Sequence, residues 1–365
     1  MPQYGWPPKP IPHVTAALRD AGSARASFRR NAAIALRKAE DDQRGHAIEA
    51  LAKLLEDADR TVRIEAARSA SALGAGELSE SVSPLLESPD PDLRIAAMEF
   101  SASTDSSGDV ERVRGILEKD EDAVVRCVAL ETLSALDPAE TRSACRTILS
   151  SPDENVPVLR TAMVLLRSDG DREDAGLFHG ILGDPRPGVS LEAAASLAHL
   201  EDERAVPRLL DEALHPSNAD ERFIALEGLC RTSDENVHDA ARRKLGSLLT
   251  GRWEKLLWAG ILASTGDMEA LEWVRGQVVG RDAKRAAAAM RVAGLCSLVS
   301  LVDMLASTAR DGLDGDEDAL YVEAIEALGL MRTSAAAAAL EPIADRSGDE
   351  LARAALEEVK RWTRS

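Results

Sequence analysis

The residues that could bind a metal ion or act as nucleophiles are few and scattered along this chain of 365 residues. The six histidines lie far apart, and the four cysteines show no Cys-x-x-Cys spacing. Zinc sites need ligands at short recurrent spacings, and nucleophilic catalysis needs a base beside the nucleophile. Neither pattern occurs, and no glycine-rich phosphate loop is present. We therefore expect no metal, no cofactor and no catalytic residue. Three of the cysteines lie among apolar helical residues and should be buried as small apolar groups, in a protein of a reducing compartment.

One acidic loop imitates the start of a calcium site. Asp314, Asp316 and Asp318 have the alternate spacing of the first ligands in an EF-hand loop. The pattern then fails, because the sixth position is Ala319 rather than glycine and the twelfth is Ile325 rather than glutamate. The segment therefore favours an acidic insertion over a calcium site.

Three tryptophans cluster in a chain whose aromatic fraction is only 3%. Trp253 and Trp258 are five residues apart and would point in different directions on one helix, and Trp273 follows in the next segment. The three rings either fill the core or form an aromatic hot spot for a partner, since tryptophan anchors many protein interfaces.

The element that must position these side chains is a repeat. A frame of Asp, a turn, Val, Arg and paired alanines recurs at a mean spacing of about 32 residues, which is typical of a solenoid. Each period holds two helical patterns, joined by a turn whose Asp or Asn is placed to cap the second helix. The anchoring arginines are Arg30, Arg63, Arg94, Arg126, Arg222 and Arg285.

This frame, as in Asp59, Val62, Arg63, Ala66 and Ala67, resembles HEAT repeats, in particular the HEAT-like repeats of the phycobilin-lyase type. The resemblance implies an all-α, right-handed α-solenoid of about eleven stacked helix pairs, forming a single domain over residues 13–365. Residues 1–12, rich in proline, would be an arm that either binds another domain or covers the first repeat.

The resemblance also implies roles for two sets of side chains. The anchoring arginines would pair with turn aspartates of their own or neighbouring repeats, here Asp59, Asp90 and Asp122. The second helices would line a concave groove, so the positions two and five residues after each anchor would face it. Those positions carry seven glutamates, Glu65, Glu99, Glu131, Glu192, Glu227, Glu323 and Glu326, with apolar Ile224, Leu257 and Met290. Such a groove suits a basic amphipathic helix or peptide, and the alternative is a solvated helix face.

The overall charge limits the classes of partner. The chain has 44 Lys and Arg against 63 Asp and Glu, a formal net charge of −19. This charge repels nucleic-acid phosphates and anionic membrane surfaces. The chain does not open like a signal peptide, and no apolar run is long enough to cross a bilayer. We expect a cytoplasmic protein that binds neither nucleic acid nor membrane.

These observations together favour a non-catalytic scaffold or adaptor that binds another protein. Among HEAT-like enzymes, iron hydroxylases use His-Glu ligands, and no histidine here is followed by glutamate. HEAT-like alkylpurine DNA glycosylases bind DNA in a basic groove, which the acidic rows disfavour. An accessory subunit of an enzyme such as a bilin lyase is the alternative, although no residue indicates a tetrapyrrole site.

Overall fold

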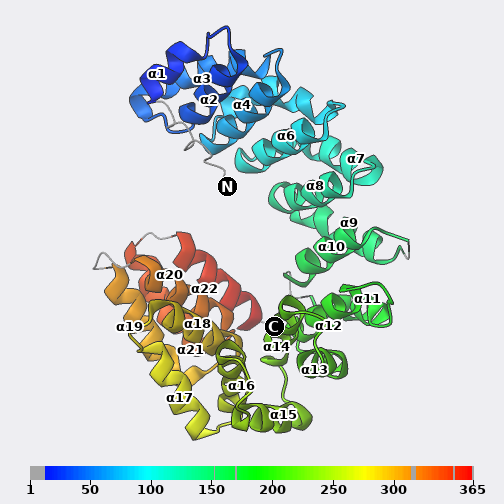
Figure 1. Cartoon of the computed structure of the whole chain (residues 1–365), viewed down its shortest axis with the longest axis vertical. Helices are drawn as coiled ribbons and strands as arrows, with labels where there is room; N and C mark the ends of the chain where they lie inside the picture. Colours follow the sequence, from blue (N-terminus) through cyan, green and yellow to red (C-terminus); the bar gives the residue numbers. More distant parts are fainter. Residues whose placement is uncertain (1–12, 152, 169–170, 314–317, 348–349, 364–365) are drawn as a thin grey trace, which may run out of the picture. The chain divides into compact units, whose positions relative to one another are not determined.

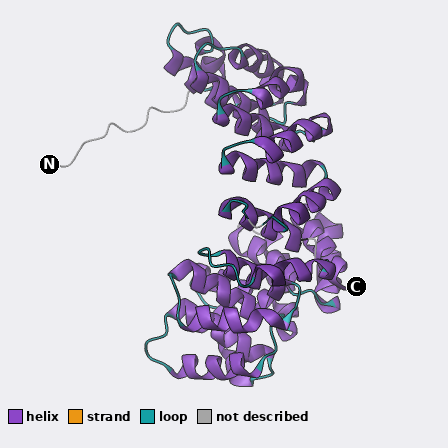
Figure 2. Cartoon of the chain, turned by 90° about the vertical axis from the view of Figure 1, so that its right-hand side faces the viewer, coloured by secondary structure: helices purple, strands orange, loops and turns teal. Residues whose placement is uncertain are grey.

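The described part of the chain consists of helices joined by turns. The computed structural model describes residues 13–151, 153–168, 171–313, 318–347 and 350–363, and within these ranges there are 22 α-helices, several short 3-10 helices and no strand (Figures 1 and 2). The predicted all-α solenoid of about eleven helix pairs is confirmed. The predicted N-terminal arm, residues 1–12, and Asp314 and Asp316 of the acidic loop lie outside the described residues.

The helices form two compact units, residues 1–165 and 166–365. In the first unit the odd-numbered helices are α1 (Val14–Asp20), α3 (Asp41–Leu55), α5 (Ser79–Val82), α7 (Val110–Lys119) and α9 (Pro138–Leu149). The even-numbered helices are α2 (Ala26–Leu36), α4 (Arg60–Ala72), α6 (Pro91–Ser103), α8 (Ala123–Leu136) and α10 (Val156–Ser168), which runs across the boundary.

The second unit repeats the same alternation. Its odd-numbered helices are α11 (Ala175–Ile181), α13 (Val206–Leu214), α15 (Glu235–Gly246), α17 (Met268–Val278), α19 (Val302–Leu313) and α21 (Ser334–Ser347). Its even-numbered helices are α12 (Val189–His199), α14 (Ala219–Leu229), α16 (Arg252–Ser264), α18 (Ala283–Leu295), α20 (Asp318–Leu330) and α22 (Glu350–Thr363). Within each unit, even-numbered helices pack on even-numbered neighbours. The single domain over residues 13–365 stays a prediction.

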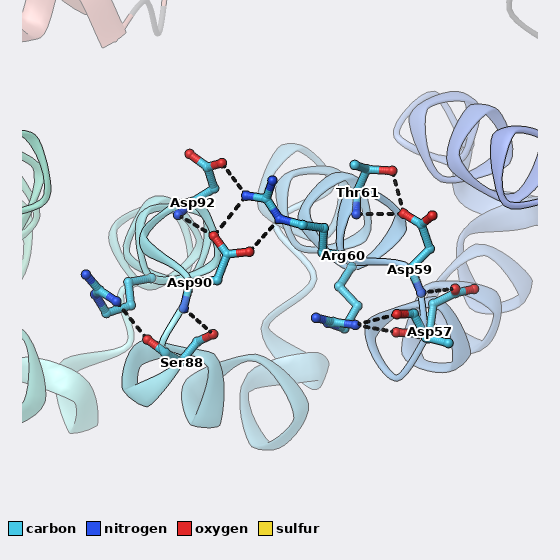
Figure 3. Close-up of polar contacts among 10 residues, drawn as sticks. Asp57, Asp59, Arg60, Thr61, Ser88, Asp90 and Asp92 are labelled. Atoms are coloured by element: carbon cyan, nitrogen blue, oxygen red, sulfur yellow. Dashed lines mark hydrogen bonds and ion pairs between the residues drawn. The ribbon is translucent and has the colours of Figure 1, made fainter.

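The turn aspartates start the second helix of each pair. The Asp59 carboxylate accepts a hydrogen bond from the Thr61 N–H at 2.8 Å, and Asp122 accepts one from the Val124 N–H at the same distance (Figure 3 shows the Asp59 cap). Each cap satisfies a backbone donor that the first turn of a helix leaves without a partner. The capping role predicted from the turns is therefore confirmed at these positions.

The anchoring arginines hold each turn to its own repeat. Arg63 donates to the carbonyl oxygen of Asp57 at 2.7 Å, and Arg94 donates to that of Ser88 at 2.8 Å; both carbonyls lie six residues earlier in the chain. Arg29 makes the same bond, to the carbonyl six residues before it, at 2.9 Å. The anchor of the first repeat is thus Arg29, and its prediction as Arg30 was one residue out of register.

The same arginines also reach a carboxylate in the next repeat. Arg29 pairs with Asp57 at 2.5 Å, and Arg94 pairs with Asp120 at 2.8 Å. Asp57 and Asp120 both stand two residues before the capping aspartate. The prediction that anchors pair with Asp59 and Asp122 is therefore wrong, because those carboxylates are held by backbone N–H groups.

Where this carboxylate is missing, the pairing moves elsewhere. The position two residues before the cap Asp90 is Ser88, so Arg63 bonds only to backbone carbonyls. Arg60 then bridges the repeats instead, with contacts of 2.6 Å to Asp90 and to Asp92 (Figure 3). Among the predicted aspartate partners, Asp90 does pair with an arginine, although with Arg60 rather than with an anchor.

Two glycines let the even-numbered helices of the second unit approach closely. A Cβ added to Gly260 on α16 would lie 2.3 Å from Val292 Cγ1, and one added to Gly294 on α18 would lie 2.5 Å from the carbonyl oxygen of Ala327 on α20. Side chains do not tolerate such distances. The glycines therefore set the spacing of α16, α18 and α20.

Candidate binding surfaces

In the first unit, the predicted groove glutamates are partly neutralised by arginines of neighbouring repeats. Glu65 lies 3.3 Å from Arg30, and Glu99 lies 3.3 Å from Arg68. Glu131 is exposed, and its carboxylate has no ion pair among the described residues. Only one of these three acids is therefore available to attract a basic partner without competition.

In the second unit, two more of the predicted glutamates are paired. Glu192 is buried and contacts Arg167 at 2.5 Å, so it does not face solvent as predicted. Glu227 on α14 pairs with Arg291 on α18 at 3.0 Å.

The remaining two, Glu323 and Glu326 on α20, have no ion pair within the described ranges. The prediction counted acids along single helices, whereas the compensating arginines come from other helices of the stack. The predicted rows are therefore mixed in charge rather than uniformly acidic.

The apolar residues of the predicted groove lie mostly in the core. Leu257 and Met290 are buried, and their assignment to a binding surface is wrong. Leu257 lies on α16 and Met290 lies on α18. The glycines bring these helices close together, so neighbouring helices cover both side chains. Ile224 is partly exposed.

The three tryptophans separate into core and surface. Trp258 is fully buried and donates from Nε1 to Glu254 at 3.2 Å, so it fills the core and cannot belong to a hot spot. Trp253 and Trp273 are exposed on α16 and α17. The core-filling interpretation therefore holds for Trp258, whereas a hot spot at Trp253 and Trp273 stays a prediction.

A cavity of about 460 Å³ lies between α15 and α17, over α16. We call it the α15–α17 groove. Its walls combine the apolar faces of three helices with two basic and two acidic side chains. The lining residues are Arg242, Leu245, Gly246, Lys255, Ala259, Leu262, Asp267, Glu269, Ala270 and Trp273.

The segments next to the lining residues in the chain carry apolar side chains that the fold leaves in solvent. Leu248 and Leu249, in the loop after α15, are each 97% exposed. Met268, at the start of α17, is 63% exposed, and Trp273 on the groove wall is 39% exposed. Exposed leucines are common singly, whereas a group of large apolar side chains beside a cavity is typical of an interaction site.

A second cluster joins distant helices of the second unit. Arg332, after α20, donates to the carbonyl oxygen of His199 at 2.7 Å and to His199 Nε2 at 2.5 Å. Its guanidinium stacks on the Trp362 ring at 3.4 Å, and Trp362 meets the His199 ring edge-on at 5.5 Å. The cluster ties α22 and the α20–α21 turn to the end of α12.

The electrostatics of this cluster keep His199 neutral. Burial, with Arg332, Arg231 and Arg167 nearby, lowers the pKa of His199 to about 2. Burial lowers the pKa of Arg332 to about 9, so its guanidinium still carries its proton at neutral pH. A neutral imidazole can accept the Arg332 hydrogen bond at Nε2, which a protonated one could not.

Sequence reasoning missed this cluster because its members are far apart in the chain. His199 and Arg332 are separated by 133 residues, and neither belongs to the repeat frame. Arg332 has a φ of 52°, which is uncommon for a residue other than glycine, but no pattern in the sequence predicts this backbone conformation. The exposed Leu248 and Leu249 were also missed, although two adjacent leucines in a loop were a visible signal.

Neither a metal site nor a membrane span is found in the part of the chain that the structure describes. No three His, Cys, Asp or Glu side chains there are grouped so that they could hold a metal ion. None of the described helices combines the length and apolarity needed to cross a bilayer.

Comparisons with known proteins support the repeat and the fold. Residues 48–134 match the family model of HEAT repeats. Importin β is similar in structure, with a TM-score of 0.59 at 14% identity, and the match covers 96% of this chain and 57% of importin β. Kap95, solved in complex with Nup1, gives a TM-score of 0.61 at 14% identity, covering 96% of this chain and 57% of that one.

The complex of CpcE and CpcF of phycocyanin lyase from Nostoc sp. PCC7120 aligns at 20% identity over 82% of this chain and 99% of that one, with a TM-score of 0.34. A search of curated proteins found no match to the sequence. The chain thus spans little more than half of the importin-type structures whose fold it shares. Residues 48–134 are therefore HEAT repeats, and the chain has the α-solenoid fold of the importin-type structures that it matches.

Proposed function

We propose that this protein is a non-catalytic interaction scaffold and that its protein partner docks in the α15–α17 groove. The observation that carries the proposal is that the exposed Trp273 lines the cavity, while the exposed side chains of Leu248, Leu249 and Met268 lie one to three residues from lining residues in the chain. Burying one such side chain against a partner contributes about 1.5–3 kcal/mol, so a few of them are enough for a specific complex.

The groove between odd-numbered helices fits a partner better than the predicted acidic rows do. Of the seven predicted glutamates, four are already paired with arginines, and the other three, Glu131, Glu323 and Glu326, have no ion pair with the described residues. A basic amphipathic partner on the even-numbered helices would have to compete with those arginines. Kap95, which shares this fold, was solved with Nup1 bound, and this supports proposing a protein partner here.

The test is affinity capture with the full chain and matched variants as bait, in the cells that express the protein. The captured proteins are identified by mass spectrometry. Leu249→Asp and Trp273→Ala should each lose a stoichiometric protein that the wild type retains. Val124→Asp is the control, because Val124 is equally apolar and 59% exposed but lies on α8 in the first unit.

Two results would overturn the proposal. A partner that all three variants retain would place its docking site elsewhere. A chromophore that copurifies in stoichiometric amount would favour an accessory role in a lyase over a scaffold.

A further inference from the structure

Elsewhere in the stack an anchoring arginine pairs with a carboxylate of the next repeat, and we call this pair the inter-repeat lock. The α15–α17 groove lies at a repeat that has neither member of it. In the equivalent groove of the first unit, Arg94 occupies the anchor position and pairs with Asp120 at 2.8 Å, and both side chains line the cavity there. In the α15–α17 groove the anchor position is held by Lys255. The residue two positions before the cap Asp282, where the carboxylate should stand, is Gly280.

The side chain of Lys255 is half-buried, and no hydrogen bond or ion pair joins its ammonium group to any described residue. The other cation of the lining, Arg242, is occupied by Asp239 at 2.7 Å. Lys255 is therefore the cation of this groove that can accept a new carboxylate.

The two acids of the lining do not satisfy Lys255. The Asp267 carboxylate caps α17 by accepting from the Ala270 N–H at 3.0 Å. Glu269 is exposed in the first turn of α17, where a negative charge is stabilised by the helix dipole. Both acids therefore serve the start of α17.

We infer that the partner supplies the missing member of the lock: an acidic side chain that pairs with Lys255, flanked by apolar side chains that cover Trp273 and Leu249. The occupant is thus an acidic amphipathic peptide segment of another protein. This inference rests on the proposed function and adds the charge and position of the contact. An ion pair closed over by apolar contacts is stronger than an exposed one, because water is excluded from it.

The experiment selects ligands from a random peptide library displayed on phage, with the immobilised full chain as bait. Peptides selected on the wild type should be enriched in Asp or Glu next to Leu, Ile, Phe or Trp. Peptides selected on Lys255→Glu should lose that acidic enrichment and gain Lys or Arg. Wild-type selections without acidic residues, or rich in basic ones, would overturn the inference.

A charge-swap measurement then locates the contact. For one selected acidic peptide, Lys255→Gln should weaken binding about tenfold, which corresponds to ~1.4 kcal/mol. The same peptide with its acid changed to the amide should bind wild type and Lys255→Gln equally. Lys255→Gln should melt like the wild type, since the Lys255 ammonium group makes no hydrogen bond or ion pair with the described residues. Unequal binding of the amide peptide would contradict the pairing.

Trp273→Ala separates the two proposals. If it weakens the peptide while Lys255→Gln does not, the groove binds partners and only the inferred ion pair fails. If neither variant changes the affinity, the peptide binds elsewhere and the proposed docking site fails as well.

Discussion

The Arg126–Glu154 pair gives the most direct energetic test of the inter-repeat lock. Arg126 on α8 contacts both Glu154 carboxylate oxygens at 2.6 Å and donates from Nε to the Leu117 carbonyl at 2.7 Å. The side chains are only 15% and 10% exposed. Removing one member of a buried pair leaves the other charge unsatisfied and costs about 3–5 kcal/mol when burial is complete. With this residual exposure, we expect Arg126→Ala to lower the free energy of unfolding of its repeat by about 3 kcal/mol.

The assay is urea unfolding together with hydrogen exchange of α8 and α10, which reports stability locally in a repeat protein. Arg60→Ala is the matched control. Arg60 also bridges two repeats at 2.6 Å, but its side chain is 52% exposed, so its loss should cost less than about 1 kcal/mol. Equal losses for Arg60→Ala and Arg126→Ala would refute the view that buried anchors stabilise the stack.

The pH dependence of the same pair follows from its pKa. Hydrogen bonds from Arg126 hold the pKa of Glu154 below its ordinary value of 4.5. The pair therefore stabilises the fold fully above that pH, and its contribution is lost as the pH falls through the lowered pKa of the folded state. The difference in stability between wild type and Arg126→Ala should accordingly narrow in acid.

Three further outcomes follow from the structure. The pKa of His199 is about 2 in the folded chain and 6.5 in the unfolded chain, so the unfolded chain binds one more proton in mild acid. The free energy of unfolding should therefore fall by up to about 1.4 kcal/mol for each pH unit below 6.5. His199→Gln should remove that pH dependence in melts between about pH 5 and 6.5. Gly294→Ala, whose Cβ would meet backbone on α20, should lower the melting temperature and increase exchange in α18 and α20, and unchanged exchange there would contradict the close packing. Glu131→Lys should leave the melting temperature unchanged, whereas Glu227→Lys should lower it by placing a cation beside Arg291, and equal melts would show that the pair contributes nothing.

The fold could be predicted because its signals are local and repeated. Asp59 and Asp122 cap helices where the turn pattern placed them, and the paired alanines Ala66 and Ala67 are buried where helices pack. A helix cap involves residues only two or three positions apart, so it can be predicted directly from the local sequence. The frame could therefore be read even where its anchor was misplaced by one residue, at Arg30 instead of Arg29.

The candidate sites depend on contacts between repeats, and these contacts cannot be predicted from the sequence pattern of one helix at a time. Glu227 lies in an acidic row of α14, but its arginine is on α18, 64 residues later. Leu257 looked like a surface residue on a helical projection, but Gly260 in the next turn allows another helix to cover that region. The His199–Arg332 contact joins ends of helices that no local periodicity relates.

At the α15–α17 groove, the informative signal in the sequence is a departure from the repeat frame. Lys255 and Gly280 stand at the two positions of the frame that Arg94 and Asp120 occupy in the first unit, and the importance of these positions becomes clear only from the ion pair that the structure shows there. Once that pairing is known, the sequence itself indicates a repeat in which both positions have changed. Departures from a repeat frame are therefore more informative about function here than the frame is.

Hydrogen exchange of the complex with the captured partner tests most directly whether that partner occupies the α15–α17 groove. Backbone amides at the end of α15, in the Leu248–Leu249 loop and in the first turns of α17 should become protected on binding. Amides of α4, α6 and α8, which carry Glu65, Glu99 and Glu131, should exchange as in the free protein. Protection confined to those even-numbered helices, with none at the groove, would contradict the account.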